Sequence, residues 1–327
     1  MVQHRVITIA VLSLVLLPSR IANAEWDKAT ASDGVEIHFE ATGTGTPLFL
    51  IAGGPGQDSE RFRFTHTLLQ PSARLVFVDG RGRGKSVIPD GKKVAYSLEK
   101  DVDDIEAVRQ KLGTPKIMVL GHSYGSMVAM AYAAKYPEHT AALISVSGCH
   151  GATVWQERNI EMVKVHLERH YPERWKRIVE LHEAGHSTGQ EPLAPMFGDL
   201  NELLVFNPES DWRLYPQLKR KRDPVEFKFN REVYLTMVGP DPEWKIEGTL
   251  AGVELLPRLK NYPGPALVLG GRHDRVSPPL NQVEIAKALP NAELVFFERS
   301  SHSPSVEEPL RFIRVVSEFI DSLPDQE

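Results

Sequence analysis

The sequence predicts an α/β protein with an open, mostly parallel, doubly wound sheet into which a helical segment is inserted. Three observations support this fold class: short continuous apolar runs, segments of helical periodicity between them, and one long stretch where that alternation stops. The chain has 327 residues, of which 42% are hydrophobic and 25% are charged. This composition is ordinary for a globular protein and supplies a large apolar core.

Six short apolar runs are expected to form buried strands, because each is bounded by Gly, Pro or charged residues. They lie at residues 48–52, 75–78, 117–120, 143–146, 266–269 and 294–297. A parallel sheet with helices on both faces requires such continuous apolar runs rather than alternating ones. Upstream, Val35, Ile37 and Phe39 alternate with polar residues after a Ser-Asp-Gly turn, which predicts an antiparallel hairpin strand at the sheet edge.

Helical segments are expected between these strands, at residues 98–112, 126–136, 280–289 and 310–323. In the last of them, Ile313, Val316 and Ile320 recur at helical spacing after Pro309, a residue type that suits the first helical position. Strand and helix therefore alternate along the chain, which favours a doubly wound sheet.

The alternation stops between residues 151 and 262. This stretch has helical patterning at residues 160–170 and 174–184, several prolines and many aromatic residues. We therefore expect a mostly helical cap at residues 151–262, inserted into a core formed by residues 25–150 and 263–327.

The first 24 residues have the layout of a secretory signal peptide. His4 and Arg5 precede twelve uncharged, mostly apolar residues at 6–17, and small residues at Ala22 and Ala24 suit cleavage after Ala24. A membrane span needs about 20 apolar residues, so no stable span is expected, and the alternative is an uncleaved interfacial anchor. We expect export to the periplasm or the outside of the cell.

Charge and cysteine content exclude several kinds of partner and site. Removing residues 1–24 takes away Arg5 and Arg20 and no acid, so the formal net charge moves from −5 to −7. An acidic protein binds nucleic acid poorly, and the only dense basic run, at residues 219–222, is expected to be a solvated helix face or loop. Cys149 is the only cysteine, so neither an internal disulfide nor a cysteine metal cluster forms. We expect no metal and no cofactor, and the oligomeric state stays open.

A nucleophile motif follows the strand predicted at residues 117–120. Residues 121–125 read G-x-S-x-G with Ser123 at the centre, and a helix rich in small residues comes next. A nucleophilic serine must stand on a tight strand-to-helix turn, and glycines two positions either side let the backbone turn without side-chain clashes. Ser123 is therefore the predicted nucleophile.

A serine hydroxyl needs a base to remove its proton and an acid to orient that base, in the chain order Ser, acid, His. Asp274 and His302 follow two later predicted strands in that order, and the carboxyl ends of parallel strands are where sites form. The alternatives are a helix-capping role for Asp274 and a solvated loop position for His302. Other histidines compete for the base, and we expect them to be packing or loop residues: His122, His150 and His273.

The oxyanion that develops during such chemistry needs two backbone N–H donors. Tyr124, directly after the serine, is expected to supply one, and Gly54 in the Gly-rich loop after the first buried strand the other. A second Gly-rich segment at residues 79–86 lacks the G-x-G-x-x-G spacing of a dinucleotide-binding loop.

Together these residues resemble the α/β-hydrolase superfamily, and within it the proline iminopeptidase branch of serine peptidases. Residues 53–56 are similar to the tail of that branch's H-G-G-P-G loop, and residues 79–86 to its D-x-R-G-x-G-x-S segment. Residues 237–244 and 247–250 are similar to its M-W-G-P-x-E-F and G-T-L-K-D segments, with one added residue between Pro240 and Glu243. The resemblance covers nearly all of residues 25–327.

The resemblance implies an α/β-hydrolase fold in which a helical cap covers the serine. It also implies that Glu243 receives the free α-amino group of the substrate, with Trp244 beside it in the binding segment. Two positions depart from the branch: Ala52 stands where it has His, and Arg275 follows the predicted catalytic acid where many members carry a second amine-binding Glu. A cation at that position repels an amine.

The expected function is therefore serine hydrolysis through an acyl-enzyme. The substrate is a short peptide or small molecule, and the leading activity is an aminopeptidase that releases an N-terminal proline or another small residue. The alternative is a carboxylesterase, lactonase or amidase that acts on a small uncharged substrate. A third hypothesis, a ligand-binding protein that kept the fold and lost the chemistry, conflicts with the presence of all three catalytic residue types.

Overall fold

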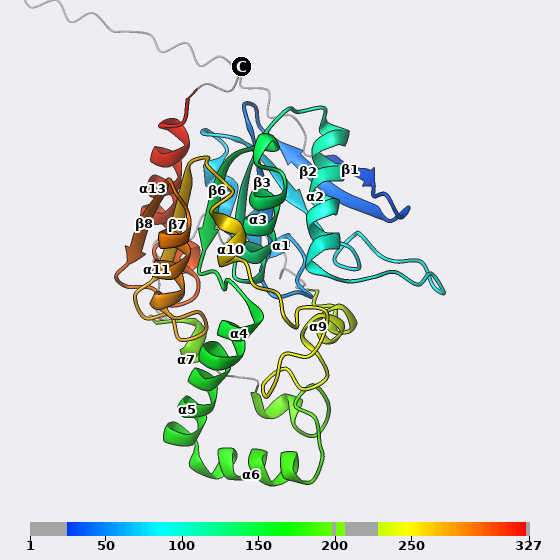
Figure 1. Cartoon of the computed structure of the whole chain (residues 1–327), viewed down its shortest axis with the longest axis vertical. Coiled ribbons are helices and arrows are strands. Elements are labelled where there is room, and N and C mark those ends of the chain that lie inside the picture. The colour runs from blue at the N-terminus through cyan, green and yellow to red at the C-terminus, as the bar shows by residue number, and fades with distance from the viewer. Residues whose placement is uncertain (1–24, 198–200, 207–227, 325–327) are drawn as a thin grey trace, which may run out of the picture.

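The computed structural model describes residues 25–197, 201–206 and 228–324, and Figure 1 shows one central sheet with helices around it. The predicted signal peptide and the basic run at residues 219–222 lie outside the described residues. The eight strands follow the order β1-β2-β4-β3-β5-β6-β7-β8. Their bounds are β1 (Glu25–Thr30), β2 (Glu36–Thr42), β3 (Pro47–Ile51), β4 (Arg74–Val78), β5 (Ile117–His122), β6 (Thr140–Val146), β7 (Ala266–Gly271) and β8 (Ala292–Phe297).

The predicted fold class is confirmed. Strands from β4 to β8 pair in parallel, whereas β2 pairs antiparallel to both β1 and β4. The predicted edge position of the hairpin strand was wrong, because β1 lies outside β2. In β1 only Ala29 is buried among the side chains from Trp26 to Thr30, so this strand has no apolar run and depends on its pairing with β2.

Helices cover both faces of the sheet (Figure 1). Alternate residues of β3 point to opposite faces: Phe49 and Ile51 join one buried cluster, and Leu48 and Leu50 join the other. The first cluster packs under α2 (Leu98–Leu112), α3 (Tyr124–Lys135), α10 (Leu256–Leu259) and α11 (Pro279–Ala288). The second packs under α1 (Glu60–His66), a 3₁₀ turn (Thr67–Leu69) and α13 (Pro309–Asp321).

The described part of the segment between β6 and β7 consists of helices joined by turns and irregular stretches. It contains α4 (Ala152–Val154), a π-helical segment (Trp155–Ile160), α5 (Glu161–His170), α6 (Pro172–Glu183), a 3₁₀ turn (Ala194–Phe197), α7 (Asn201–Leu204) and α9 (Arg231–Val238). In Figure 1, α5 and α6 project away from the sheet. They form a small cluster of their own around Leu167 and Ile178, whereas Val233 and Met237 of α9 belong to the cluster that covers the sheet.

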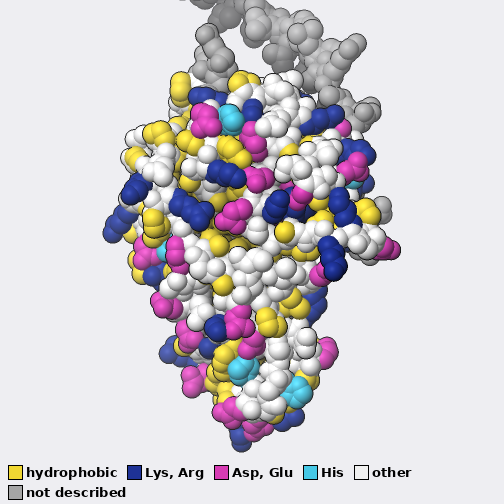
Figure 2. All heavy atoms as spheres, turned by 45° about the vertical axis from the view of Figure 1, so that its right-hand side comes forward, with side chains coloured by type: hydrophobic (Ala, Val, Ile, Leu, Met, Phe, Trp, Pro, Cys, Tyr) yellow, Lys and Arg dark blue, Asp and Glu magenta, His cyan; other side chains and the backbone are white. Residues whose placement is uncertain are grey.

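The visible surface mixes charges. On the face shown in Figure 2, Lys and Arg side chains lie interspersed with Asp and Glu side chains. Within the described ranges, no helix combines the length and the apolar character needed to cross a bilayer.

The parallel pairing brings several strand ends to one edge of the sheet. Ile51 at the end of β3 lies opposite Gly121 of β5, and His122 at the end of β5 lies opposite Val146 of β6. The loops that follow β3, β5, β7 and β8 therefore meet at this edge, which is where a site forms in an open α/β sheet.

Candidate active site

Ser123 occupies a strained turn between β5 and α3. Its backbone has φ 55° and ψ −119°, a conformation that non-Gly residues rarely adopt, and its N–H donates to Val146 O at 2.9 Å. The flanking glycines allow this turn, because a Cβ at Gly121 would lie 2.0 Å from Gly125 O and one at Gly125 would lie 2.2 Å from Ile51 O. The motif spacing thus follows from the close approach of α3 to the sheet.

His302 and Asp274 are hydrogen-bonded to each other at the same edge. His302 Nδ1 lies 2.9 Å from Asp274 Oδ2, and the two residues are only 5% and 3% exposed. The other carboxylate oxygen, Oδ1, accepts from the N–H groups of Val276 at 2.9 Å and Ser277 at 2.8 Å. The carboxylate accepts the proton on Nδ1, which leaves Nε2 of the imidazole as the basic nitrogen.

Ser123, His302 and Gly54 meet in one cavity of about 210 Å³. The cavity is lined by Gly53, Gly54, Gln57, Phe62, Thr65, His122, Ser123, Leu204, Val276, His302, Ser303, Ser305 and Val306. Asp274 does not line the cavity itself and is linked to it through its hydrogen bonds with His302 and Val276. The lining therefore places a serine and a basic histidine together in partly apolar surroundings.

Two backbone amides beside the cavity have no partner among the described residues. The N–H groups of Gly54 and Tyr124 donate no hydrogen bond there, whereas Gly54 O accepts from Gln57 N at 3.0 Å. Gly54 has φ +53°, and Tyr124 is the first residue of α3, where helix N–H groups are unpaired and favour negative charge. Their role as oxyanion donors stays a prediction.

The chain is similar to known proteins over most of its length. Residues 46–309 match the family model described as alpha/beta hydrolase fold. The chain belongs to the α/β-hydrolase family. It is also similar to the proline iminopeptidase of Lactobacillus delbrueckii subsp. bulgaricus, with 31% identity over 281 residues that cover 84% of this chain and 90% of that protein. The predicted family resemblance is confirmed.

Solved structures show the same fold. The proline iminopeptidase of Mycobacterium smegmatis has a TM-score of 0.69 and 22% identity, and the match covers 91% of this chain and 98% of that chain. A thermophilic esterase from Thermogutta terrifontis has a TM-score of 0.60 and 25% identity, with 92% and 99% covered. This α/β hydrolase therefore shares its architecture with both a peptidase and an esterase.

Among the histidines of this α/β hydrolase, His122 lies where the sequence did not predict it. His122 was expected to be a packing or loop residue, but it lines the cavity, and its Nε2 lies 2.7 Å from His302 O. The pair is 180 residues apart in sequence, and the only local signal was the position of His122 beside the nucleophile. The other two competitors lie elsewhere: His150 bonds to Glu284, and His273 stacks on Phe206.

The loop that carries His302 is also held by groups that local patterns did not reveal. Buried Glu307 accepts from Ser301 N at 2.8 Å and from Phe206 N at 2.9 Å. His302 N donates to Leu204 O at 3.2 Å. The residues after α7 and the His302 loop are thus bonded directly to each other.

Glu243 and Trp244 are not among the residues that line the cavity. Trp244 stacks on His182 with ring centroids 3.8 Å apart, and Lys164 Nζ lies 4.6 Å from its ring centre. Glu243 retains some exposure, yet its carboxyl group is densely surrounded, and burial together with the Asp241 charge raises its pKa to about 7. The expected contact of both residues with substrate stays a prediction.

Two further residues that do not line the cavity bear on the chemistry. Arg275 follows Asp274 with its side chain exposed. Burial raises the pKa of the Cys149 thiol to about 12, so this cysteine stays protonated and is a poor nucleophile.

In the part of the chain that the structure describes, no group of three or more His, Cys, Asp or Glu residues is placed to hold a metal ion.

Proposed function

We propose that this α/β hydrolase is a serine hydrolase that works through an acyl-enzyme. The observation that carries the proposal is the meeting of Ser123, on its strained turn, with His302 in one cavity, while Nδ1 of His302 is bonded to buried Asp274. This arrangement brings together a nucleophile, a base and an orienting acid, the three groups that acyl transfer uses.

In the proposed reaction, Ser123 Oγ attacks the substrate carbonyl carbon while His302 Nε2 takes the hydroxyl proton. The oxyanion that forms accepts hydrogen bonds from the Gly54 and Tyr124 amides. His302 then gives its proton to the leaving group, and the acyl group stays on Ser123 until a water, deprotonated by His302, releases it as a carboxylic acid. Asp274 stabilises the imidazolium through its bond to Nδ1.

For the substrate, we propose a short peptide or aminoacyl amide with a free N-terminal proline or another small residue. The similarity to proline iminopeptidases supports this substrate. The position of Glu243 in the chain also supports it, because Glu243 lies in the loop after α9. At the start of α9, Asn230 N donates to Gly56 O at 2.8 Å, so this helix is bonded to the predicted oxyanion loop. A carboxylate in a lidded site pairs strongly with an ammonium group and discriminates against blocked N-termini.

A second candidate is hydrolysis of a small uncharged ester, lactone or amide. It is favoured by the described lining of the cavity, which contains no carboxylate, and by the position of cationic Arg275 beside Asp274. A site of this composition does not by itself attract an ammonium group.

The two candidates are separated by comparing the rates on prolyl- and alanyl-anilides with the rates on short p-nitrophenyl esters. Anilide turnover far above ester turnover supports the aminopeptidase, and the reverse supports the second candidate. Absence of turnover on both, together with no labelling of Ser123 by a fluorophosphonate, would overturn the serine hydrolase proposal and favour a ligand-binding protein.

A further inference from the structure

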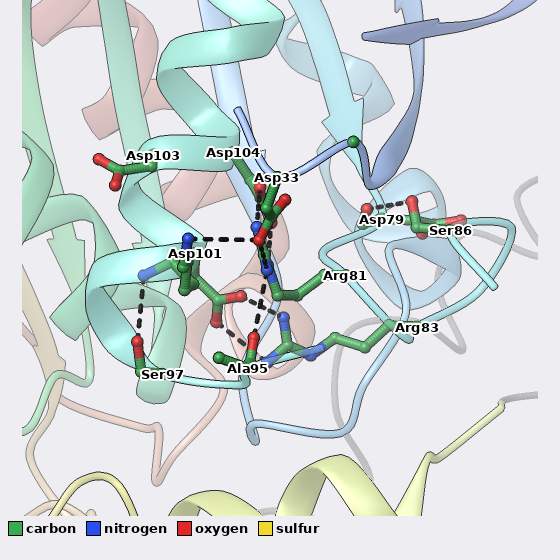
Figure 3. Close-up of polar contacts among 12 residues, drawn as sticks. Asp33, Asp79, Arg81, Arg83, Ser86, Ala95, Ser97, Asp101, Asp103 and Asp104 are labelled. Atoms are coloured by element: carbon green, nitrogen blue, oxygen red, sulfur yellow. Dashed lines mark hydrogen bonds and ion pairs between the residues drawn. The ribbon is translucent and has the colours of Figure 1, made fainter. Parts of the chain in front are cut away.

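A buried ion pair lies behind the predicted oxyanion loop. Arg83, in the Gly-rich loop after β4, donates from Nη1 to Asp101 Oδ1 at 2.8 Å and from Nη2 to Asp101 Oδ2 at 3.0 Å. Both residues are 5% exposed. Figure 3 shows Arg83 reaching across to Asp101 in the first turn of α2, with Ser97 just before that helix. Ser97 caps the helix by accepting from Lys100 N at 3.2 Å, which fixes the turn that carries the carboxylate.

This ion pair is bonded to both sides of the predicted oxyanion hole. On one side, Arg83 Nε donates to Pro55 O, the carbonyl directly after Gly54. On the other side, Asp101 Oδ2 accepts from the Tyr124 hydroxyl at 2.7 Å. Burial and the Asp101 charge raise the pKa of Tyr124 well above its usual value, so this hydroxyl stays protonated and donates. Loops after three different strands are therefore tied to one carboxylate and one guanidinium.

The packing between the Gly54 loop and this network is incomplete. A cavity of about 30 Å³ separates them, and Gly54, Gln57, Arg83, Asp101 and Tyr124 all line it. A backbone that is not close-packed from behind depends on its hydrogen bonds for its position. The contact between Arg83 and Pro55 O is such a bond, and it is buried, where hydrogen bonds to a charged group are strongest.

We propose that Arg83, Asp101 and the Tyr124 hydroxyl are positioning residues that hold the Gly54 and Tyr124 amides at the spacing required by the oxyanion. The inference rests on the proposed function, because it concerns the same oxyanion. None of the three side chains touches the reacting atoms. Their effect is on the transition state, in which negative charge develops on the carbonyl oxygen, rather than on binding of the neutral substrate.

The same elements provide matched controls. Arg81 lies two residues before Arg83 and makes an equally buried bidentate pair with Asp104 of α2, at 2.8 and 2.6 Å, but its remaining bonds go to Asp33 and Ala95 O (Figure 3). Tyr132 lies on α3 like Tyr124, and its buried hydroxyl donates to Glu106 of α2 at 2.9 Å. These contacts resemble those of the network but do not reach the Gly54 loop.

The experiment compares wild type with Tyr124→Phe and Tyr132→Phe. It measures kcat and KM on whichever of the anilide and ester substrates wild type turns over. It also measures the inhibition constant of a trifluoromethyl ketone, which forms an oxyanion when the serine adds to it. For Tyr124→Phe we expect kcat to fall about 10- to 100-fold and the ketone to bind more weakly by a similar factor, because a small displacement of an oxyanion donor has this effect. KM and the pH midpoint of kcat/KM should stay unchanged, since substrate binding and His302 are untouched. Tyr132→Phe should keep wild-type kcat.

Two outcomes would overturn the inference: wild-type kcat in Tyr124→Phe, or an equal loss in Tyr132→Phe. If Tyr124→Phe does not fold, the pair Arg83→Met/Asp101→Leu is compared with Arg81→Met/Asp104→Leu, because replacing both members of a buried ion pair with apolar residues often preserves stability. Equal kcat in these two double variants also overturns it.

Ser123→Ala separates this inference from the proposed function. Full activity in Ser123→Ala refutes the serine mechanism itself. An inactive Ser123→Ala together with a fully active Tyr124→Phe refutes only the positioning role.

Discussion

At the residue scale, Ser123 offers the most direct test of the proposed chemistry. Ser123→Ala removes the hydroxyl and leaves the strained turn, so turnover should fall on the order of 10⁶-fold while the thermal midpoint stays near that of wild type. Steady-state kinetics and thermal unfolding measure both effects. His302→Ala should lose nearly as much activity, because removing either of two residues that act together costs about as much as removing both. A Ser123→Ala protein with more than about a tenth of wild-type activity contradicts the mechanism.

Glu243 leads to a pH-dependent prediction. With a pKa raised to about 7 by burial and by Asp241, its carboxyl is neutral below that pH and ionised above it. The ratio of kcat/KM for an aminoacyl anilide to kcat/KM for an ester cancels the pH effects on the catalytic steps that both substrates share. This ratio should rise as pH approaches 7 and fall above about 8, where the substrate amine loses its proton.

The Glu243→Gln variant checks the origin of that pH dependence. Loss of a charge-assisted hydrogen bond of about 1.5 to 3 kcal/mol should lower anilide kcat/KM roughly 10- to 150-fold, leave ester hydrolysis unchanged and flatten the ratio. Arg275→Glu is the converse variant and should raise anilide turnover selectively. Equal losses on both substrate types in Glu243→Gln, with no gain in Arg275→Glu, would show that the site does not bind an amine.

At the scale of elements, the turn between β5 and α3 depends on the close approach of backbones. Gly125→Ala would place a Cβ 2.2 Å from Ile51 O, so α3 must move away from β3, and the free energy of unfolding should fall by about 3 kcal/mol or more. Gly113, the left-handed C-cap of α2, has open space around it, and Gly113→Ala should cost only about 1 kcal/mol from its φ of +64°. Urea unfolding compares the two, and equal losses contradict the packing argument.

Elements were predictable where a local pattern encodes them. The apolar runs identified β3 to β8. In β3 to β7, burial on both faces leaves little place for polar residues, whereas the edge strand β8 is only partly buried. The strand β1 escaped prediction, since pairing with β2 defines it and only Ala29 among its described side chains is buried. The helix predicted at residues 160–170 begins one residue later as α5 and is preceded by a π-helical segment that helical periodicity does not distinguish.

At the scale of the whole molecule, export remains our proposal. It rests on the charged start, the apolar run at residues 6–17 and the small residues before Glu25. N-terminal sequencing of exported protein should begin at Glu25, where β1 begins. Retention of Met1 on exported material would refute cleavage after Ala24.

By itself the sequence determined the fold class, the family and the order of candidate catalytic residues, because periodicity and motif spacing are properties of neighbouring residues. Tertiary structure alone decided which distant groups meet. It placed His122 against His302 O, tied Arg83 and Asp101 to both sides of the predicted oxyanion hole, and left Glu243 outside the cavity lining. These contacts depend on how loops from separate strands converge at one sheet edge, and a one-dimensional pattern does not contain distances between residues far apart in the chain.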